Sequence, residues 1–583
     1  MDRGKPECYP LSSNISRGLG PGPRPNRILM KKPTVWPAGF VLAFALAAAP
    51  RTLGAQLPAG PPADTLRPAA AGDTAVPPRH ATEWVPIGTP AEDRLRTAQL
   101  LGEAPTAGFL IRSVSSATQV AEGEEGARLL RPHVRGVWNS YLPMGANDGL
   151  AWNGRGGTVY VSAGVRARFG GVTVIAAPEV AYAQNREFQR VYPAAGRSSF
   201  ANPFHGPASP LDAPLRFGPR SFTQLSLGQS SVTARFGSFA AGGATENLWW
   251  GPGIRNALVM SNNASGFPHL FVRTRPEGIG TRFGTLQGQW VSGALGQSGY
   301  SGVDDDGRTL AGIALAFTPR GEPGLTLGLT RAVYRTGSAW GAPLRFLDVF
   351  AIVSHPEAVR PPRLEQPAGR SDQLFSLFGR WVFPASGFET YGEWARQQGF
   401  GSFSELVSRP GATSGYTLGM QWVATGERRG RMRLQAEITS LEQNDAVRGR
   451  RQQSFYTSVN VPQGYTHRGQ VLGAAIGPGS SAQWAAADYL RPDWRLGVFL
   501  ERTRWDEDAL ERISTRNPRG HDTQGLAGVR AGRRFGGWEL ASEYSFGRRL
   551  NWLFQNTARS FFDFDAVDLN VSSFTLSVSP ALR

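Results

Sequence analysis

The chain has 583 residues, is 40% hydrophobic with a mean hydropathy of −0.28, and carries a formal charge of +17. Apart from an export signal near the N-terminus, no run of about 20 apolar residues exists, which excludes a protein built from transmembrane helices. So polar a chain crosses a bilayer with its backbone hydrogen bonds satisfied only as a closed β-barrel. The length also exceeds what one soluble core usually supports, whereas a barrel wall needs no thick core.

Residues 30–55 have the features of an export signal. Two lysines follow Met30, a long apolar run comes next, and small residues precede Gln56. We therefore expect the true start at Met30, with residues 1–55 forming an N-terminal extension plus signal peptide. Removing this part takes away Cys8, the single cysteine of the chain. The mature protein would then have neither disulfides nor cysteine metal sites.

The mature chain would keep a positive excess of about +11, carried by arginine without lysine. Arginine presents a planar fork that suits carboxylates and phosphates. An arginine-lined lumen would therefore attract acidic sugars or phosphate-bearing lipid. Nucleic acid is excluded as a partner because the protein is exported and has no clustered basic run.

Two short regions are expected to precede the wall of the barrel. Residues 56–88 are rich in proline and alanine, which is typical of a flexible tether. Residues 89–130 are predicted to form a small periplasmic helical element. Its first helix starts after Thr89, a good N-cap, and stops at Gly102. A second short helical piece is predicted from Pro105 to Arg112.

Alternating strands dominate the rest of the chain, and the clearest runs from Val159 to Phe169. Its valines, alanines and phenylalanine fall on one face, and its polar residues and arginines on the other. One face therefore suits lipid and the other a polar lumen. The sequence predicts an all-β fold, a transmembrane antiparallel β-barrel of roughly 16 to 18 strands in the cell outer membrane, over residues 131–583. Its wall is expected from about Gly136 to Val578.

Two long segments interrupt the alternation, Phe188 to Phe222 and Trp340 to Ser371. Both are rich in proline, arginine and glycine, and both are too long for tight turns. They are expected to be extracellular loops or segments folded into the lumen.

The segment from Glu246 to Ala264 combines adjacent tryptophans, an arginine and two asparagines. Flat indole faces stack on sugar rings, while amide and guanidinium groups bind hydroxyls. The same residues would equally suit an aromatic anchor with a glycine-proline turn. The residue pattern by itself leaves both interpretations open.

Five motifs are spread over most of the barrel, namely Trp249–Gly253, Leu258–Ala264, Ser371–Leu374, Phe388–Trp394 and Gly469–Gly479. In their order and spacing they resemble the capsule-assembly Wzi family. The resemblance implies an outer-membrane barrel of about 18 strands, a periplasmic helical part, and a lectin-like role that holds capsular polysaccharide at the cell surface. The C-terminus departs from the usual aromatic ending of barrel proteins.

From this resemblance and the residue chemistry we predict a polysaccharide-binding site and a lumenal charge lattice. The expected ligand is an acidic capsular or exopolysaccharide, and the other expected partners are outer-membrane lipid and the polysaccharide export machinery. The predicted binding residues are Trp249, Trp250, Arg255, Asn262, Asn263 and Arg273. The predicted lattice residues are Glu389, Tyr391, Glu393, Arg431, Arg433 and Glu437.

A porin or substrate-specific channel is the alternative function, because it would share every feature of the wall. An enzyme is not expected. Glu389 and Glu393 would lie roughly 14 Å apart along a strand, beyond the about 5–10 Å of a glycosidase pair. Ser261 with His269 is the conceivable lipase-like pair, and nothing else singles it out. The scattered histidines show no metal-ligand spacing, so neither metal nor cofactor is predicted.

Overall fold

The computed structural model describes most of the chain after residue 84. The predicted extension, the signal peptide and the tether up to residue 84 lie outside the described residues. These are 85–106, 108–117, 125–191, 193, 197–207, 209–303, 307–337, 345–350, 371–397, 413–424, 430–443, 453–513, 520–555 and 567–581.

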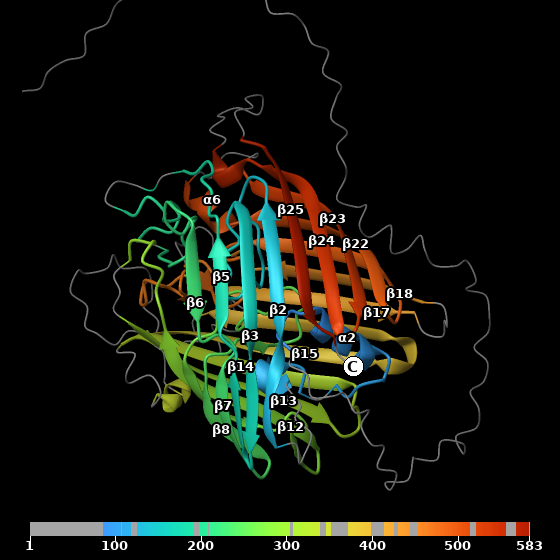
Figure 1. The fold of residues 1–583 in the computed structure, drawn as a ribbon. Helices are drawn as coiled ribbons and strands as arrows, with labels where there is room; N and C mark the ends of the chain where they lie inside the picture. The colour runs from blue at the N-terminus through green and yellow to red at the C-terminus, as the bar shows by residue number, and fades with distance from the viewer. Residues whose placement is uncertain are drawn as a thin grey trace, which may run out of the picture. The chain divides into compact units, whose positions relative to one another are not determined.

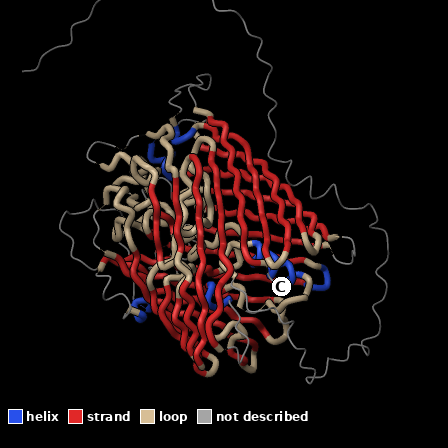
Figure 2. Tube along the Cα trace, viewed as in Figure 1, coloured by secondary structure: helices blue, strands red, loops and turns tan. Residues whose placement is uncertain are grey.

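Within this part of the chain, 18 antiparallel strands close into one barrel (Figures 1 and 2). Three positions in the wall hold two strand segments each, namely β4 with β5, β6 with β7, and β10 with β11. The first wall strand, β2, pairs with the last, β25, which leaves the sheet without a free edge. The predicted fold class is confirmed. The wall strands are β2 (Gly126–Asn139), β3 (Gly156–Phe169), β4 (Val172–Ala176), β5 (Glu179–Ala183), β6 (Phe222–Ser226), β7 (Ser231–Phe236), β8 (Phe239–Ala244), β10 (His269–Thr274), β11 (Ile279–Gly280), β12 (Gly284–Leu295), β13 (Arg308–Pro319), β14 (Leu325–Thr336), β15 (Ser371–Phe383), β16 (Phe388–Gln397), β17 (Ser414–Val423), β18 (Arg431–Ser440), β21 (Ser481–Leu490), β22 (Trp494–Trp505), β23 (Asp522–Phe535), β24 (Trp538–Leu550) and β25 (Leu569–Pro580).

Two small two-stranded sheets stand apart from the wall, β1 with β9 and β19 with β20. The second helical piece predicted from Pro105 to Arg112 is wrong, because Ile111 and its neighbours pair with β9 as a strand. None of the described helices is long and apolar enough to cross a membrane. The remaining elements are α2 (Pro90–Leu100), β1 (Ile111–Ser113), α3 (Val114–Ala117), β9 (Leu248–Trp250), η3 (Phe346–Phe350), η4 (Pro384–Ser386), β19 (Thr466–His467), β20 (Gln470–Val471), α6 (Glu507–Ile513) and η5 (Trp552–Phe554).

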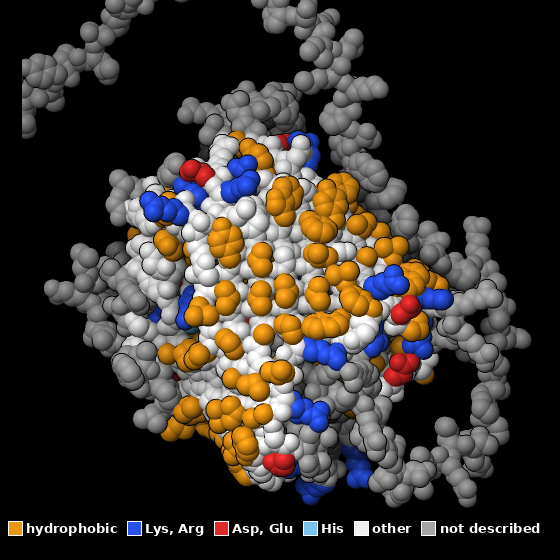
Figure 3. Space-filling view, in the orientation of Figure 1, with side chains coloured by type: hydrophobic (Ala, Val, Ile, Leu, Met, Phe, Trp, Pro, Cys, Tyr) orange, Lys and Arg blue, Asp and Glu red, His pale blue; other side chains and the backbone are white. Residues whose placement is uncertain are grey.

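Strand β3 has the two faces that its alternating residues predict. Val159 is 48% exposed and Val165 is 37% exposed, whereas Arg166 is only 2% exposed. The same alternation on the neighbouring strands covers the outside of the wall with apolar side chains (Figure 3). This outer surface is the lipid-facing belt of an outer-membrane protein.

An arginine in place of Val165 is expected to impair assembly, because the new charge would face hydrocarbon. The expected loss of folding free energy is about 2–4 kcal/mol if the site lies at mid-membrane. The shift of the folded band on an unheated gel would measure it. Val165→Leu is the matched control, since it keeps an apolar side chain at the same position. A folded yield equal to that of the control would mean that this face does not contact lipid.

The two ends of the barrel differ in the length of their connections (Figure 1). Tight turns such as residues 170–171 and 536–537 lie at one end, and long connections such as 184–221 and 441–480 lie at the other. Outer-membrane barrels place short turns in the periplasm and long loops outside the cell. Helix α2 lies at the short-turn end, where Arg94 contacts Glu539 at the start of β24.

The chain fills much of the lumen with its own segments. Of the two long segments, Phe188–Phe222 folds inward around Leu211, which is 1% exposed in the main lumenal core. Most of Trp340–Ser371 lies outside the described residues. The same core contains Trp250, Phe267 and Tyr456. These buried groups occupy space that would be open water in a wide channel.

Candidate functional site

The two adjacent tryptophans of the predicted sugar site are both buried. Trp250 is 0% exposed and donates an Nε1–H hydrogen bond to Oε1 of Gln289, at 2.9 Å. Its ring lies so close to Gly312 that a Cβ there would stand 2.6 Å from a ring carbon. Trp249 is 2% exposed, and the guanidinium of Arg112 lies 4.8 Å from its ring centroid. Neither indole has a face open to a sugar, so the packing role left open by the sequence fits both rings.

The other four predicted binding residues separate into two groups. Arg273 is buried and donates hydrogen bonds to the hydroxyls of Ser113 and Ser115, so its guanidinium is bound within the protein. The side-chain amide of Asn262 donates a hydrogen bond to the backbone carbonyl of Asn147, at 3.0 Å. Arg255 and Asn263 do border open space, because each lines a lumenal cavity.

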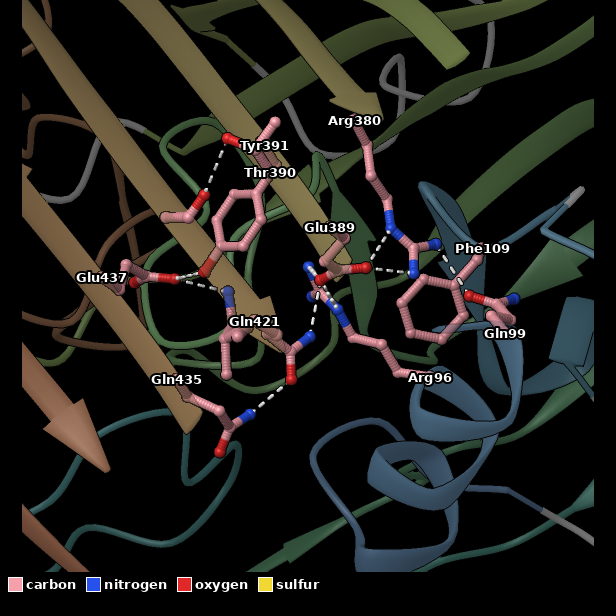
Figure 4. A network of polar contacts seen from close by, with 12 residues as sticks. Arg96, Gln99, Phe109, Arg380, Glu389, Thr390, Tyr391, Gln421, Gln435 and Glu437 are labelled. Carbon is pink, nitrogen blue, oxygen red and sulfur yellow. Dashed lines mark hydrogen bonds and ion pairs between the residues drawn. The ribbon is translucent and has the colours of Figure 1, made fainter. Parts of the chain in front are cut away.

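Glu389 is the centre of the lattice at the short-turn end (Figure 4). This carboxylate is 0% exposed and lies between two guanidinium groups, at 2.6 Å from Arg96 of α2 and 2.6 Å from Arg380 of β15. Gln421 of β17 donates a third contact at 2.5 Å. Arg380 also donates to Gln99 of α2. Three consecutive wall strands, β15 to β17, therefore hold the sequence-distant helix α2 through one buried carboxylate.

Glu437 and Glu393 hold the segment that follows the tryptophan pair. Glu437 accepts a hydrogen bond from the Tyr391 hydroxyl at 2.8 Å, and others from the backbone N–H groups of Ile254, Arg255 and Asn256. Glu393 accepts one from the backbone N–H of residue 258, at 2.9 Å. These carboxylates therefore anchor a lumenal loop.

The remaining two lattice residues lie on β18 and form ion pairs with α2 and with the segment just after it. Arg433 is 1% exposed and pairs with Asp93 of α2 and with Asp488 of β21, both at 2.8 Å. Burial alone would raise the pKa of Asp93, but Arg433 and Arg495 outweigh that effect and hold the pKa below its ordinary range. Arg431 meets Glu103 at the rim, where both side chains are partly exposed. In this structure, the six residues predicted as a lattice serve largely to fasten the lumenal segments.

Two adjoining cavities lie among these segments, with volumes of about 300 Å³ and 260 Å³. Inward faces of β21–β25 form much of the lining of the first, and long connections line most of the second. Trp505 borders both cavities, and its Nε1–H is buried without a partner among the described residues. The shared lining residues are Pro143, Gly145, Asp148, Asn153, Ala475, Ile476 and Trp505.

The first cavity combines aromatic rings with hydrogen-bonding groups. Trp484 is 5% exposed, and its Nε1–H also lacks a partner among the described residues. Arg255 forms an ion pair with Glu501 at 2.7 Å, while Glu543 has no ion-pair or hydrogen-bond partner in the described part of the chain. The lining is completed by small polar side chains, Gln524, Ser545, Ser573 and Thr575.

The second cavity has a histidine and a carboxylate on its wall. Nε2 of His205 lies 3.8 Å from Oδ2 of Asp506. Burial raises the pKa of Asp506 to about 7, with the neighbouring Asp508 adding to the shift. Burial lowers the pKa of His205 to about 3, so this imidazole is neutral at physiological pH. The pair therefore offers hydrogen-bonding groups with little fixed charge.

The sequence reasoning did not select the aromatic residues of these cavities. Trp484 and Trp505 lie on the lumenal side of β21 and β22, as strand parity allows. For Trp505, the available signal was a large aromatic residue on the face of β22 that also carries Arg495, Glu501 and Thr503. The corresponding face of β21 carries Ala482 and Ala486 beside Trp484 and gives no such contrast. Trp152 and Trp552 come from irregular connections, for which strand parity predicts nothing.

The chain is similar to known proteins in sequence pattern and in fold. The family described as "Capsule assembly protein Wzi" matches residues 144–560. No curated protein matches the chain. Among solved structures, Wzi of Escherichia coli, described as a carbohydrate-binding β-barrel of group 1 capsule assembly, is 12% identical with a TM-score of 0.49, over 77% of this chain and 85% of that one. OprD of Pseudomonas aeruginosa is 11% identical with a TM-score of 0.37, over 79% and 95%. OccAB2 of Acinetobacter baumannii is 8% identical with a TM-score of 0.37, over 77% and 97%.

Proposed function

Since this chain belongs to the capsule-assembly Wzi family and forms an outer-membrane β-barrel, we propose that it binds capsular or extracellular polysaccharide at the cell surface without catalysing a reaction. The adjoining lumenal cavities are the proposed site. The observation that carries this assignment is the aromatic and hydroxyl-binding lining around Trp484 and Trp505.

The filled lumen supports binding over passage of solutes. Helix α2 is tied to the wall through Glu389 and Arg433, both buried. Above it, the core around Trp250 and Tyr456 occupies the interior. A porin keeps an open polar path, and these contacts oppose one. The channel alternative is therefore the weaker reading of the described structure.

The cavity chemistry supports a sugar ligand. Guanidinium groups lie over both rings, those of Arg255 and Arg530 at 5.4 Å and 5.3 Å from the Trp484 centroid and that of Arg549 at 4.6 Å from the Trp505 centroid. The half-buried Trp505 therefore offers the cavities an apolar ring edge and a donor N–H, which match the mixed character of a sugar ring. Glu543 and Gln524 supply acceptors for hydroxyl groups, and the lining serines and Thr575 supply both donors and acceptors. A concave site with aromatic walls and a few placed polar groups is the usual form of a small-ligand pocket.

The lining does not support the predicted preference for an acidic polymer. Among the residues of the first cavity, Asp148, Glu437, Glu501 and Glu543 outnumber Arg255. An acidic sugar there would meet like charges, which disfavours binding. We therefore propose that the cavity accepts uncharged sugar units, and that the arginine excess of the chain acts elsewhere.

Replacing Trp505 with alanine is expected to weaken polysaccharide binding by about tenfold or more, because apolar contact area and a donor N–H are lost together. Polysaccharide purified from the culture medium of the producing cells is the probe, and its binding to the purified full-length protein is measured by calorimetry. Retention of polysaccharide on cells that carry the variant gives a second readout.

Trp494→Ala is the matched control. Trp494 belongs to the same strand, β22, but it is 36% exposed on the outer face. This variant should bind polysaccharide as the unmodified protein does. Equal binding by the Trp505 variant, or no binding by the unmodified protein, would contradict the proposed site or the proposed function, respectively.

A further inference from the structure

An arginine cluster lies on the rim of the barrel at the long-connection end. The backbone N–H of Arg186 donates to the carbonyl of Arg155 at 2.9 Å, which places the two arginines side by side just beyond β5 and β3. Asn185 donates to the carbonyl of Arg220 at 2.9 Å, which brings the third arginine to the same corner, just before β6. Three neighbouring wall positions therefore each contribute one arginine.

These guanidinium groups carry charge that the protein leaves largely unbalanced. Arg186 and Arg220 are exposed, and neither guanidinium has a hydrogen-bond or ion-pair partner among the described residues. Arg155 donates to two backbone carbonyls and lies 5.1 Å from the ring centroid of Tyr141. The nearby Glu187 already contacts two other arginines, at 3.6 Å and 3.7 Å.

The cluster stands at the upper border of the lipid-facing belt. On β5, Tyr182 points outward and is 43% exposed, and Arg186 follows three residues after the strand ends at Ala183. On β2, which pairs with β3, Trp138 is 48% exposed, and Tyr141 beyond it is 38% exposed. Exposed tyrosine and tryptophan at this level mark the membrane interface.

The surface view agrees with this placement. In Figure 3, basic side chains gather above the upper ends of β3 and β5, while apolar side chains cover the wall below them. Arg186 and Arg220 are exposed at this rim, and none of the three arginines lines either proposed sugar cavity.

We propose that Arg155, Arg186 and Arg220 form a binding site for the phosphate groups of an anionic glycolipid in the outer leaflet. The guanidinium fork matches two phosphate oxygens at once. The aromatic residues beneath the cluster contact the upper acyl region of the same lipid. The site fixes the barrel in the leaflet from which the polysaccharide extends. It is independent of the lumenal cavities, so either assignment can fail without the other.

The test measures lipid binding by the full-length protein folded in detergent. Bisphosphorylated lipid A is the probe, and dephosphorylated lipid A, inorganic phosphate and polyglucuronate are the comparison ligands. The triple variant Arg155→Ala, Arg186→Ala and Arg220→Ala is expected to bind the phosphorylated lipid at least tenfold more weakly. The corresponding triple lysine variant should recover part of the affinity, because lysine keeps the charge and loses the fork.

Arg533→Ala is the matched control, since Arg533 is an exposed outward arginine at the short-turn end of β23. It should leave lipid binding unchanged, and added salt should weaken binding to the unmodified protein. The proposal is overturned if the triple alanine variant, folded by the gel-shift criterion, binds bisphosphorylated lipid A as tightly as the control. It is also overturned if the phosphorylated and dephosphorylated lipids bind equally, or if polyglucuronate or inorganic phosphate is bound in preference to the lipid.

Discussion

Replacing Glu389 with glutamine is expected to loosen helix α2 and to open a path through the lumen. The substitution keeps the shape of the side chain and removes its charge, which leaves Arg96 and Arg380 buried against a neutral group. Their side chains are only 5% and 2% exposed. Breaking a buried ion pair from one side typically costs about 3–5 kcal/mol. Channel openings in planar bilayers should then appear in the variant and be rare in the unmodified protein.

Glu103→Gln is the matched control, because it also removes a carboxylate that pairs an N-terminal residue with the wall. Its partner is Arg431, and the two side chains are 53% and 37% exposed. Exposed pairs of this kind contribute about 0–1 kcal/mol. The control should therefore show neither new conductance nor faster proteolysis near α2. Equal conductance in the Glu389 variant and the control would mean that the lattice does not hold helix α2 in place.

Replacing Trp250 with alanine is expected to destabilise the lumenal core by about 3–5 kcal/mol. The indole is fully buried, and its removal leaves a cavity as well as an unpaired Gln289. The temperature at which the folded band disappears on a gel should fall. Polysaccharide binding per folded molecule should change little, because this ring does not border either cavity.

Trp250→Phe separates packing from hydrogen bonding. It retains most of the ring volume and loses the Nε1–H donor, so its cost should be smaller than that of alanine. The sugar-binding role predicted from the sequence would be supported instead if the Trp250→Ala protein were as heat-resistant as the unmodified one and no longer bound polysaccharide. Arg255→Ala offers an internal comparison, since Arg255 does border the first cavity.

The sequence was informative where structure follows from neighbouring residues. Alternation along β3 predicted which side chains face lipid, because successive side chains of any strand point to opposite faces. The same local rule predicted the fold class and the outer-membrane location, and both are confirmed. The helical prediction from Pro105 to Arg112 was wrong, because Ile111 and Arg112 pair with β9 and the described residues before them are non-helical.

What the sequence by itself determined was the barrel, its membrane setting and its family motifs. Only the tertiary structure decided how the lumen is filled, because the contacts that hold α2 and the tryptophan pair join distant parts of the chain. Arg96 and Glu389 are 293 positions apart, and Trp250 reaches Gln289 on another strand. An adjacent tryptophan pair has the same composition whether it is buried or open to a sugar. Its role therefore depends on which segments cover it, and in this protein the covering segments leave Trp484 and Trp505 beside the cavities instead.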